Sequence, residues 1–163
     1  MKRYCYYDSP IGMMLLAGRE GVLEELYFPN ATATLAVPAE WIRDEVVFAE
    51  PLHQLQEYFA GKRQEFELQI APQGTPFQKE VWRELCRIPY GKTASYQAIA
   101  EQLGKPKACR AVGMANGRNP LPIIIPCHRI IGKNGTLTGF GGGLPVKRQL
   151  LELERGLPSL WEK

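Results

Sequence analysis

The sequence predicts an α+β protein, with a small N-terminal α/β domain built on an antiparallel sheet and a mainly α C-terminal domain. The first 28 residues alternate short strand-forming runs with turn residues, which indicates an antiparallel meander. From residue 75 onward, helix caps and helical spacings of apolar residues dominate instead. A length of 163 residues suits two small lobes. We therefore expect one domain over residues 1–74 and a second over residues 75–163.

The N-terminal strands are predicted from aromatic and apolar runs that lie between turns. Tyr4–Tyr7 is rich in aromatic residues that favour strands, and Ser9–Gly12 has the composition of a tight turn. Residues 29–45 show no clean period, so we expect a loop there. The predicted strands are residues 4–7, 13–17 and 22–28, and the predicted turns are residues 9–12 and 18–21.

A helix and one more strand are predicted before the domain boundary. Residues 51–59 carry apolar side chains at helical spacing, with Pro51 suited to a first turn and Gly61 to the stop. Residues 65–70 alternate polar and apolar side chains, which is typical of a strand. Residues 71–74 then read as a linker.

The C-terminal half opens with a helix-start signal and continues with a helix-turn-helix pattern. Thr75 is a cap residue, Pro76 suits the first helical position and Gln78 completes a capping box, so a helix should run to about residue 87. Short helices over residues 95–103 and 108–115 then flank a tight turn. The recognition helix would span residues 107–116, with Arg110 near its start. Because many such helix pairs have no role in DNA binding, this pattern alone leaves both possibilities open.

The remainder of the chain surrounds one cysteine, Cys127. An irregular Pro-rich stretch and a buried apolar run should precede it, and Asn134-Gly135 predicts a hairpin after it. The glycine run that follows lacks the phosphate-loop pattern, so a packed loop beside a ligand is the better interpretation. The expected segments are irregular chain at 119–122, a buried run at 123–125, the glycine loop at 138–143 and a helix at 145–155 with Val146, Leu150 and Leu153 on one face.

Charge is divided unequally between the two halves. The net charge is +3, but residues 1–74 hold 6 Lys and Arg against 11 Asp and Glu, whereas residues 75–163 hold 14 against 6. If the protein meets a polyanion, the second half should meet it.

The four cysteines are scattered and form no paired motif. We expect reduced thiols in a cytoplasmic protein, with Cys5, Cys86 and Cys109 structural, and no metal or other cofactor. His53 is interpreted as a surface or packing residue. The sequence contains no apolar run of membrane-spanning length and no signal-peptide pattern, so no membrane association is expected.

Cys127 is the candidate nucleophile. It follows a buried apolar run and Pro126, and His128 and Arg129 come directly after it. A thiol attacks carbon as the thiolate, which a neighbouring base or cation favours. Because adjacent residues of an extended chain point in opposite directions, we expect His128 to reach the sulfur through a water. On these residues alone, an inert buried cysteine stays an open alternative.

Around Pro126-Cys127-His128-Arg129 the sequence closely resembles the O6-alkylguanine-DNA alkyltransferases. Further pieces match that family in order and together cover residues 75–157, whereas the N-terminal half resembles it only in length and strand order. These pieces are Ile88–Gly91, Ser95-Tyr96, Arg110–Gly113, Asn119-Pro120, Gly142-Gly143 and Leu150–Glu154. The resemblance implies a ribonuclease H-like N-terminal domain and direct repair of alkylated DNA.

The resemblance also implies a role for each matching residue in the chemistry. Cys127 would accept the alkyl group from O6-alkylguanine, and O4-alkylthymine is a further possible substrate. His128 would act as its base through a water, with Glu154 orienting the imidazole. Tyr96 would bind or protonate guanine N3, and Asn119 would hold the turn before the active-site segment. The base pocket would be formed by Ile130, Phe140, Gly141 and Arg129.

For DNA, the resemblance implies minor-groove binding of the duplex by the helix-turn-helix, with nucleotide flipping. Arg110 would occupy the space of the flipped nucleotide. The other DNA-binding residues would be Ser95, Ala108, Ala111 and Gly113, of which the last three are small enough for close approach. We expect a monomer in solution, and cooperative binding on DNA is a further possibility. Because a thioether has no good leaving group, the protein should be consumed in one transfer.

Two departures from the family pattern concern single sites. Phe140 and Gly141 stand where many relatives have Tyr or Ser, so side-chain hydrogen bonds there are lost. Cys5 alone cannot supply the N-terminal zinc site of some relatives. Three other functions compete with alkyl transfer. A non-catalytic alkylguanine-binding protein would lack Cys127, whereas a sequence-specific helix-turn-helix transcription factor would have a structural Cys127. A cysteine hydrolase would turn over.

Overall fold

The computed structural model describes residues 1–28, 37–133, 135 and 143–156. The chain forms two compact units, one over Met1–Pro72 and one that begins at Gln73. Within the described residues, no helix is both long and apolar enough to cross a membrane.

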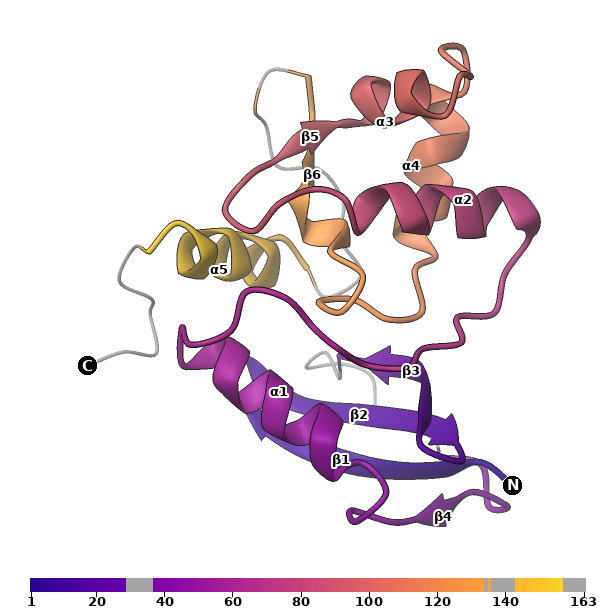
Figure 1. Cartoon of the computed structure of the whole chain (residues 1–163), viewed down its shortest axis with the longest axis vertical. Coiled ribbons are helices and arrows are strands. Elements are labelled where there is room, and N and C mark those ends of the chain that lie inside the picture. The colour runs from indigo at the N-terminus through magenta and orange to yellow at the C-terminus, as the bar shows by residue number, and fades with distance from the viewer. Residues whose placement is uncertain (29–36, 134, 136–142, 157–163) are drawn as a thin grey trace. The chain divides into compact units, whose positions relative to one another are not determined.

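The first unit is built on a four-stranded sheet (Figure 1). Strands β1 (Arg3–Ser9), β2 (Gly12–Arg19) and β3 (Val22–Tyr27) form the expected antiparallel meander. The turn between β1 and β2 is closed by Ser9, whose hydroxyl donates to the Gly12 carbonyl at 2.6 Å. The three predicted strands are therefore confirmed, and each differs from its predicted bounds by only one or two residues.

The loop prediction for residues 29–45 is wrong at one point. Ile42–Arg43 forms strand β4, which pairs in parallel with β1 at the edge of the sheet. The Ile42 amide donates to the Lys2 carbonyl at 3.0 Å, and the Asp44 amide donates to the Tyr4 carbonyl at 2.9 Å. The open edge of β1 thus supplies hydrogen-bond partners that no periodicity within residues 29–45 could reveal.

Helix α1 (Ala49–Phe59) packs its buried residues against the sheet, and Phe59 stacks on Tyr7 with ring centroids 6.2 Å apart. It begins two residues before the predicted start. The strand predicted at 65–70 is wrong, because only Ile70 forms a bridge, to Leu23. Instead, the buried Gln54 side chain bonds both the amide and the carbonyl of Glu67, at 2.9 and 3.2 Å. A side chain on the helix therefore satisfies backbone groups that a neighbouring strand would otherwise bond.

The second unit is mainly helical (Figure 1). The capping box predicted at its start is present, since Thr75 accepts from the Gln78 amide and Gln78 accepts from the Thr75 amide. The elements are α2 (Pro76–Leu85), β5 (Ala94–Ser95), α3 (Tyr96–Gln102), α4 (Cys109–Gly117), the 3-10 turn η1 (Cys127–Arg129), β6 (Ile130–Ile131) and α5 (Leu144–Glu154).

Helices α2, α3 and α4 share one core and give the predicted helix-turn-helix. The Trp82 indole of α2 is buried and donates to the Ala115 carbonyl of α4 at 2.9 Å. Val112 of α4 and Ile99 of α3 are buried as well, and burying an aliphatic side chain of this size contributes about 1.5–3 kcal/mol. The packing therefore holds α4 by one face and leaves its opposite face to solvent.

Strand β6 has a partner that the hairpin signal at Asn134-Gly135 does not predict. It pairs in parallel with β5, with Ala94 opposite Ile130 and Ser95 opposite Ile131. The returning strand of the predicted hairpin lies among residues 136–142, outside the described residues. The parallel pair places the start of α3 directly beside the segment that follows Cys127.

Candidate active site

Asn119 organises the chain that leads into Cys127. Its side-chain amide donates to the Ile125 carbonyl at 2.8 Å, and its oxygen accepts from the Leu121 amide at 2.9 Å. The Ile125 amide in turn donates to the Leu121 carbonyl at 2.8 Å. One side chain thus ties both ends of the irregular segment at residues 119–125 together.

The buried run at 123–125 is confirmed, and it includes an unusual backbone conformation. Ile123 is 1 % exposed and has a φ of +75°, a region that β-branched residues rarely enter. Such a conformation costs about 1–3 kcal/mol, which the surrounding packing must offset. The segment is therefore held by burial and by Asn119 rather than by regular secondary structure.

Cys127 lies in η1 and is 4 % exposed. Burial raises the pKa of its thiol to about 11, although a hydrogen bond from Asn119, the charge of Lys147 and a backbone hydrogen bond act in the opposite direction. The resting thiol is therefore protonated at neutral pH, and deprotonation needs a base. The expectation of an extended chain here is wrong, because Cys127, His128 and Arg129 form one 3-10 turn.

A buried polar cluster follows the cysteine and consists of His128, Arg129 and Glu154. The Nε2 of His128 lies 2.6 Å from Oε2 of Glu154. Arg129 donates two hydrogen bonds to the same carboxylate, from Nε at 2.7 Å and from Nη2 at 3.1 Å. Its Nη1 donates to the Ile88 carbonyl at 2.7 Å. This cluster joins η1 to α5, since Arg129 and Glu154 are 25 residues apart in the chain.

Charge within this cluster decides the protonation state of His128. Burial raises the pKa of Glu154, but its bonds with His128 and Arg129 outweigh burial and lower that pKa to about 2. Burial lowers the pKa of His128, so the imidazole is neutral at physiological pH. An ionised Glu154 accepts the Nε2 hydrogen, which leaves Nδ1 as the basic nitrogen. In the described part of the chain, Nδ1 is buried and has no hydrogen-bond partner.

Lys147 is a site residue that the sequence analysis missed. Its side chain is 0 % exposed on α5, and its positive charge favours the Cys127 thiolate. Burial lowers the pKa of Lys147, while the Cys127 anion raises it. A signal was present in the sequence: Lys147 shares a helical stripe with Leu150, Leu151 and Glu154, so a lysine falls on the buried face of the predicted helix.

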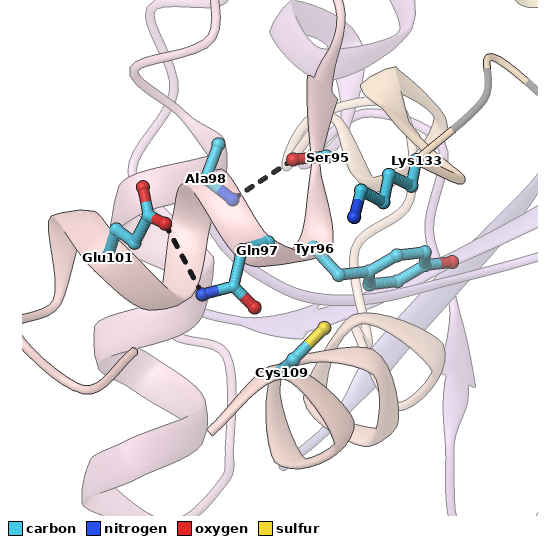
Figure 2. Close-up of a pocket in the computed structure, with 7 residues that line it drawn as sticks. All are labelled: Ser95, Tyr96, Gln97, Ala98, Glu101, Cys109 and Lys133. Atoms are coloured by element: carbon cyan, nitrogen blue, oxygen red, sulfur yellow. Dashed lines mark hydrogen bonds between the residues drawn. The ribbon is translucent and has the colours of Figure 1, made fainter. Parts of the chain in front are cut away.

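Tyr96 stands at the start of α3 beside an open pocket of about 510 Å³ (Figure 2). The Ser95 hydroxyl caps α3 by accepting from the Ala98 amide at 3.0 Å. The Tyr96 ring lies over α4, because a Cβ built on Gly113 would be 3.6 Å from two ring carbons. Cys127 does not line this pocket; its lining residues are Ser95, Tyr96, Gln97, Ala98, Glu101, Cys109 and Lys133.

The solvent face of α4 is formed by small residues between two arginines. Arg110, Ala111, Gly117 and Arg118 are exposed, and so is Met114, at 59 %. Ala108 and Gly113 are half-buried. Arg118 is the C-cap residue of α4 and lies about two turns beyond Arg110 on the exposed part of the helix.

The remaining predicted pocket residues fall into two groups. Ile130 is fully buried, and the Arg129 guanidinium is bonded to Glu154 and Ile88 as described above. Phe140 and Gly141 lie outside the described residues. His53, which was predicted to be a surface or packing residue, lies on the surface, and its Nε2 is 3.5 Å from Oε1 of Glu57.

Comparison with known proteins covers both units. The model of the 6-O-methylguanine DNA methyltransferase DNA-binding domain matches residues 76–156, and that of the ribonuclease-like domain of the same proteins matches residues 2–72. A methylated-DNA–protein-cysteine methyltransferase of Methanosarcina barkeri is 53 % identical over 152 residues, which are 91 % of this chain and 96 % of the relative.

A solved structure gives the same result. The crystal structure of Mycobacterium tuberculosis OGT in complex with DNA has a TM-score of 0.90 and 47 % identity, covering 98 % of this chain and 96 % of that chain. The predicted α+β fold and its ribonuclease-like N-terminal domain are thereby confirmed. This chain belongs to the 6-O-methylguanine DNA methyltransferase family.

Proposed function

We propose that the protein repairs DNA directly by moving the alkyl group of O6-alkylguanine onto Cys127. The observation that carries this proposal is the buried Cys127 thiol next to a His128–Glu154 pair whose free ring nitrogen is Nδ1. Family membership supports the same chemistry, because relatives at about half identity are named methylated-DNA–protein-cysteine methyltransferases.

The proposed reaction is one displacement at carbon. His128 Nδ1 takes the thiol proton through a bridging water, and Glu154 stabilises the imidazolium that results. The Cys127 thiolate attacks the alkyl carbon, the carbon–O6 bond breaks, and its electron pair stays on guanine. Tyr96 donates to N3 of the departing base, which offsets the charge that develops there. The guanine anion then takes up a proton at N1, which balances the proton that His128 removed from the thiol, so the products are a thioether at Cys127 and an unmodified guanine.

Lys147 has an electrostatic part in this scheme. Its buried cation favours the anionic form of Cys127, while burial disfavours it. A charge in a site with little water acts more strongly than the same charge at the surface. Lys147 is therefore proposed to lower the pKa of the Cys127 thiol, so that a base as weak as a neutral imidazole can remove its proton.

The same geometry predicts that each molecule acts once. A thioether sulfur has no proton to lose and no good leaving group, so no second attack follows. The protein would then be an acceptor consumed in equal amount to the lesion, whether the alkyl group comes from O6-alkylguanine or from O4-alkylthymine.

DNA is proposed to bind along the exposed face of α4. Arg118 can neutralise a phosphate, and the small Ala111 and Gly117 permit close approach to a minor groove. Arg110 would fill the place of the flipped nucleotide, and Ser95, Ala108 and Gly113 would lie at the edge of the interface. We expect a monomer to bind first, with any cooperative assembly visible as a dependence on protein concentration. Free thiols at all four cysteines suit action in the cytoplasm.

An intact-mass measurement tests this function. The full-length protein is mixed with duplex DNA that contains one O6-methylguanine, and both the protein and the base are analysed. We expect one methyl group per protein chain, located on Cys127, and none in the Cys127→Ser variant. Methyl on another cysteine, or repair by the Cys127→Ser variant, would contradict the proposal.

A further inference from the structure

Met114 is the large apolar side chain on the exposed face of α4. It is 59 % exposed, whereas Val112 and Ala115 of the same helix are buried. The exposed residues Ala111 and Gly117 are small, so Met114 projects from a surface that otherwise permits close approach. A single exposed methionine is ordinary on a protein surface, and exposure by itself therefore assigns Met114 no role.

The position of Met114 places it on the surface proposed to bind DNA. Arg110 lies four residues before Met114 on α4, so the two side chains are neighbours on one side of the helix. Arg118, the C-cap residue, follows four residues after Met114 and is exposed as well. An apolar side chain therefore lies between the residue proposed to replace the flipped nucleotide and a cation for phosphate.

A groove of about 340 Å³ opens beside Met114, where α4 packs against α2 (Figure 1). Its lining includes the cation of Arg118 and the apolar side chains of Phe77, Ala111, Met114 and Ala115. The rim of a DNA minor groove is complementary to this lining, because deoxyribose rings offer apolar faces and phosphates carry negative charge. A strand that lies along this groove would bring Met114 over the floor of the minor groove.

The floor of the minor groove differs between base pairs by one polar group. An A·T pair shows only acceptors there, N3 of adenine and O2 of thymine, whereas a G·C pair adds the 2-amino group of guanine as a donor. The thioether of Met114 is only a weak acceptor, so it cannot replace the water that this amino group binds. Covering a G·C pair with Met114 therefore leaves a donor without a good partner, which is unfavourable.

We propose that Met114 covers the minor-groove floor next to the lesion and makes repair slower when the base pair beneath it is G·C. This inference rests on the proposed function and adds a residue that sets a sequence preference around the lesion. Four residues of an α-helix advance about 6 Å along its axis, and stacked base pairs are about 3.4 Å apart. Because Arg110 is proposed to fill the place of the flipped nucleotide, Met114 should cover a base pair within about two of it.

The test removes this amino group from one neighbouring base pair at a time. Each duplex carries one O6-methylguanine, and at each of the two positions on either side a G·C pair is compared with a hypoxanthine·C pair, which lacks only the 2-amino group. Single-turnover transfer rates of the full-length protein are measured below saturation, so that binding contributes to the rate. At one of these positions, the wild-type protein should react about fivefold faster with hypoxanthine·C, which corresponds to about 1 kcal/mol. In Met114→Ala the ratio should stay below about twofold, because the smaller side chain leaves room for water at the amino group.

Two further variants complete the test. Met114→Gln has a side chain of similar length whose amide oxygen accepts a hydrogen bond from the 2-amino group, so it too should lose the preference. Met13→Ala removes a methionine of β2 that is 44 % exposed, and it should keep the wild-type ratio. Each ratio compares two duplexes with one protein, so a general loss of activity in a variant cancels.

Two outcomes overturn the role of Met114. One is a ratio in Met114→Ala and Met114→Gln that equals the wild-type ratio at every position, and the other is a wild-type ratio below about twofold at all of them. Transfer of the methyl group to Cys127 from any of these duplexes tests the proposed function separately. Its absence from all of them would overturn both the proposed function and the role of Met114.

Discussion

The environment of Cys127 opposes ionisation and assists it at the same time. Burial is the larger influence and raises the pKa of the thiol to about 11, whereas Asn119 and Lys147 lower it. The thiol is therefore inert until a substrate and a base are in place, which protects a residue that can react only once. The proposed mechanism therefore requires that the Cys127 thiol loses its proton only when the substrate is bound.

Replacing Lys147 tests this balance. Lys147→Met removes a cation that favours the thiolate, so the pKa of Cys127 should rise and transfer at pH 7 should slow about tenfold for each pKa unit gained. Because the loss is one of ionisation, it should be constant well below pH 11 and shrink only as pH approaches the thiol pKa of about 11. The rate of alkyl transfer from free O6-benzylguanine, measured from pH 6.5 to 11, checks this without a contribution from DNA affinity.

The control for that experiment is Arg148→Met, which removes an exposed cation from the neighbouring position of α5. Its rate should stay within about twofold of wild type, since exposed charges are strongly screened. A loss in Lys147→Met that stays equal up to pH 11 would point to a packing role for Lys147.

The Glu154 carboxylate links the site to stability. Its pKa is lowered from 4.5 to about 2, so the stabilisation that its ionised form provides is complete above about pH 4.5 and is lost as pH falls toward 2. Glu154→Gln should lower the free energy of unfolding at pH 7 by about 3 kcal/mol, because Arg129 is left buried without its carboxylate. Urea unfolding should show a difference between the two proteins at pH 3 that is smaller than at pH 7. An equal difference at both values would mean that this carboxylate does not titrate as described.

At the scale of single residues, the sequence pointed to Cys127, His128, Asn119 and Glu154 through a shared motif, and the structure brings them together. It did not reveal the positive φ of Ile123, because that conformation depends on packing between segments distant in the chain. The helical stripe places Lys147 on a buried face, but the sequence does not show that this face meets Cys127. The burial of Asn116 on α4 likewise depends on packing. A polar residue near a helix end is ordinary in sequence and becomes informative only when its burial is known.

Among the elements, α4 has two working faces. One packs on α2 through Trp82 and Ala115, and the other exposes Arg110, Ala111 and Arg118. The helix could be predicted because its apolar residues follow a period of 3.6 and a turn precedes it. Elements that depend on remote partners were predicted poorly: Glu67 bonds a glutamine of α1 where a strand was expected, and the pairing of β6 with β5 was not foreseen.

The two arginines of α4 should act only when DNA is the substrate. Arg110→Ala and Arg118→Ala should each slow repair of an O6-methylguanine duplex, with Arg110→Ala the more severe, and leave transfer from free O6-benzylguanine within about twofold of wild type. The reason is that a phosphate contact or an intrahelical side chain contributes nothing to a free base. Comparison of the two substrates for each variant is the measurement.

Arg83→Ala is the matched control, since Arg83 is an exposed arginine of α2. It should affect neither substrate by more than about twofold. Equal losses on duplex and free base for Arg110→Ala would exclude an intrahelical role for that residue.

At the scale of the whole molecule, the two units differ in charge and in architecture. The sheet-bearing first half is acidic, and the helical second half is basic and contains every residue proposed for chemistry or DNA binding. Composition and periodicity are averaged over many residues, so they can indicate such differences in charge and secondary-structure content from the sequence. The reaction could not be predicted from such averages, and depends on one sulfur and the few groups around it.

A titration of repair against the amount of protein tests directly whether each chain accepts one alkyl group on Cys127 and is then consumed. Increasing amounts of protein are added to a fixed excess of duplex DNA with radiolabelled O6-methylguanine, and label on protein and on DNA is counted after completion. Transfer should stop at one methyl group per protein chain, and the label should lie on Cys127. Continued loss of label from DNA beyond that equivalence, or label on any other residue, would contradict it.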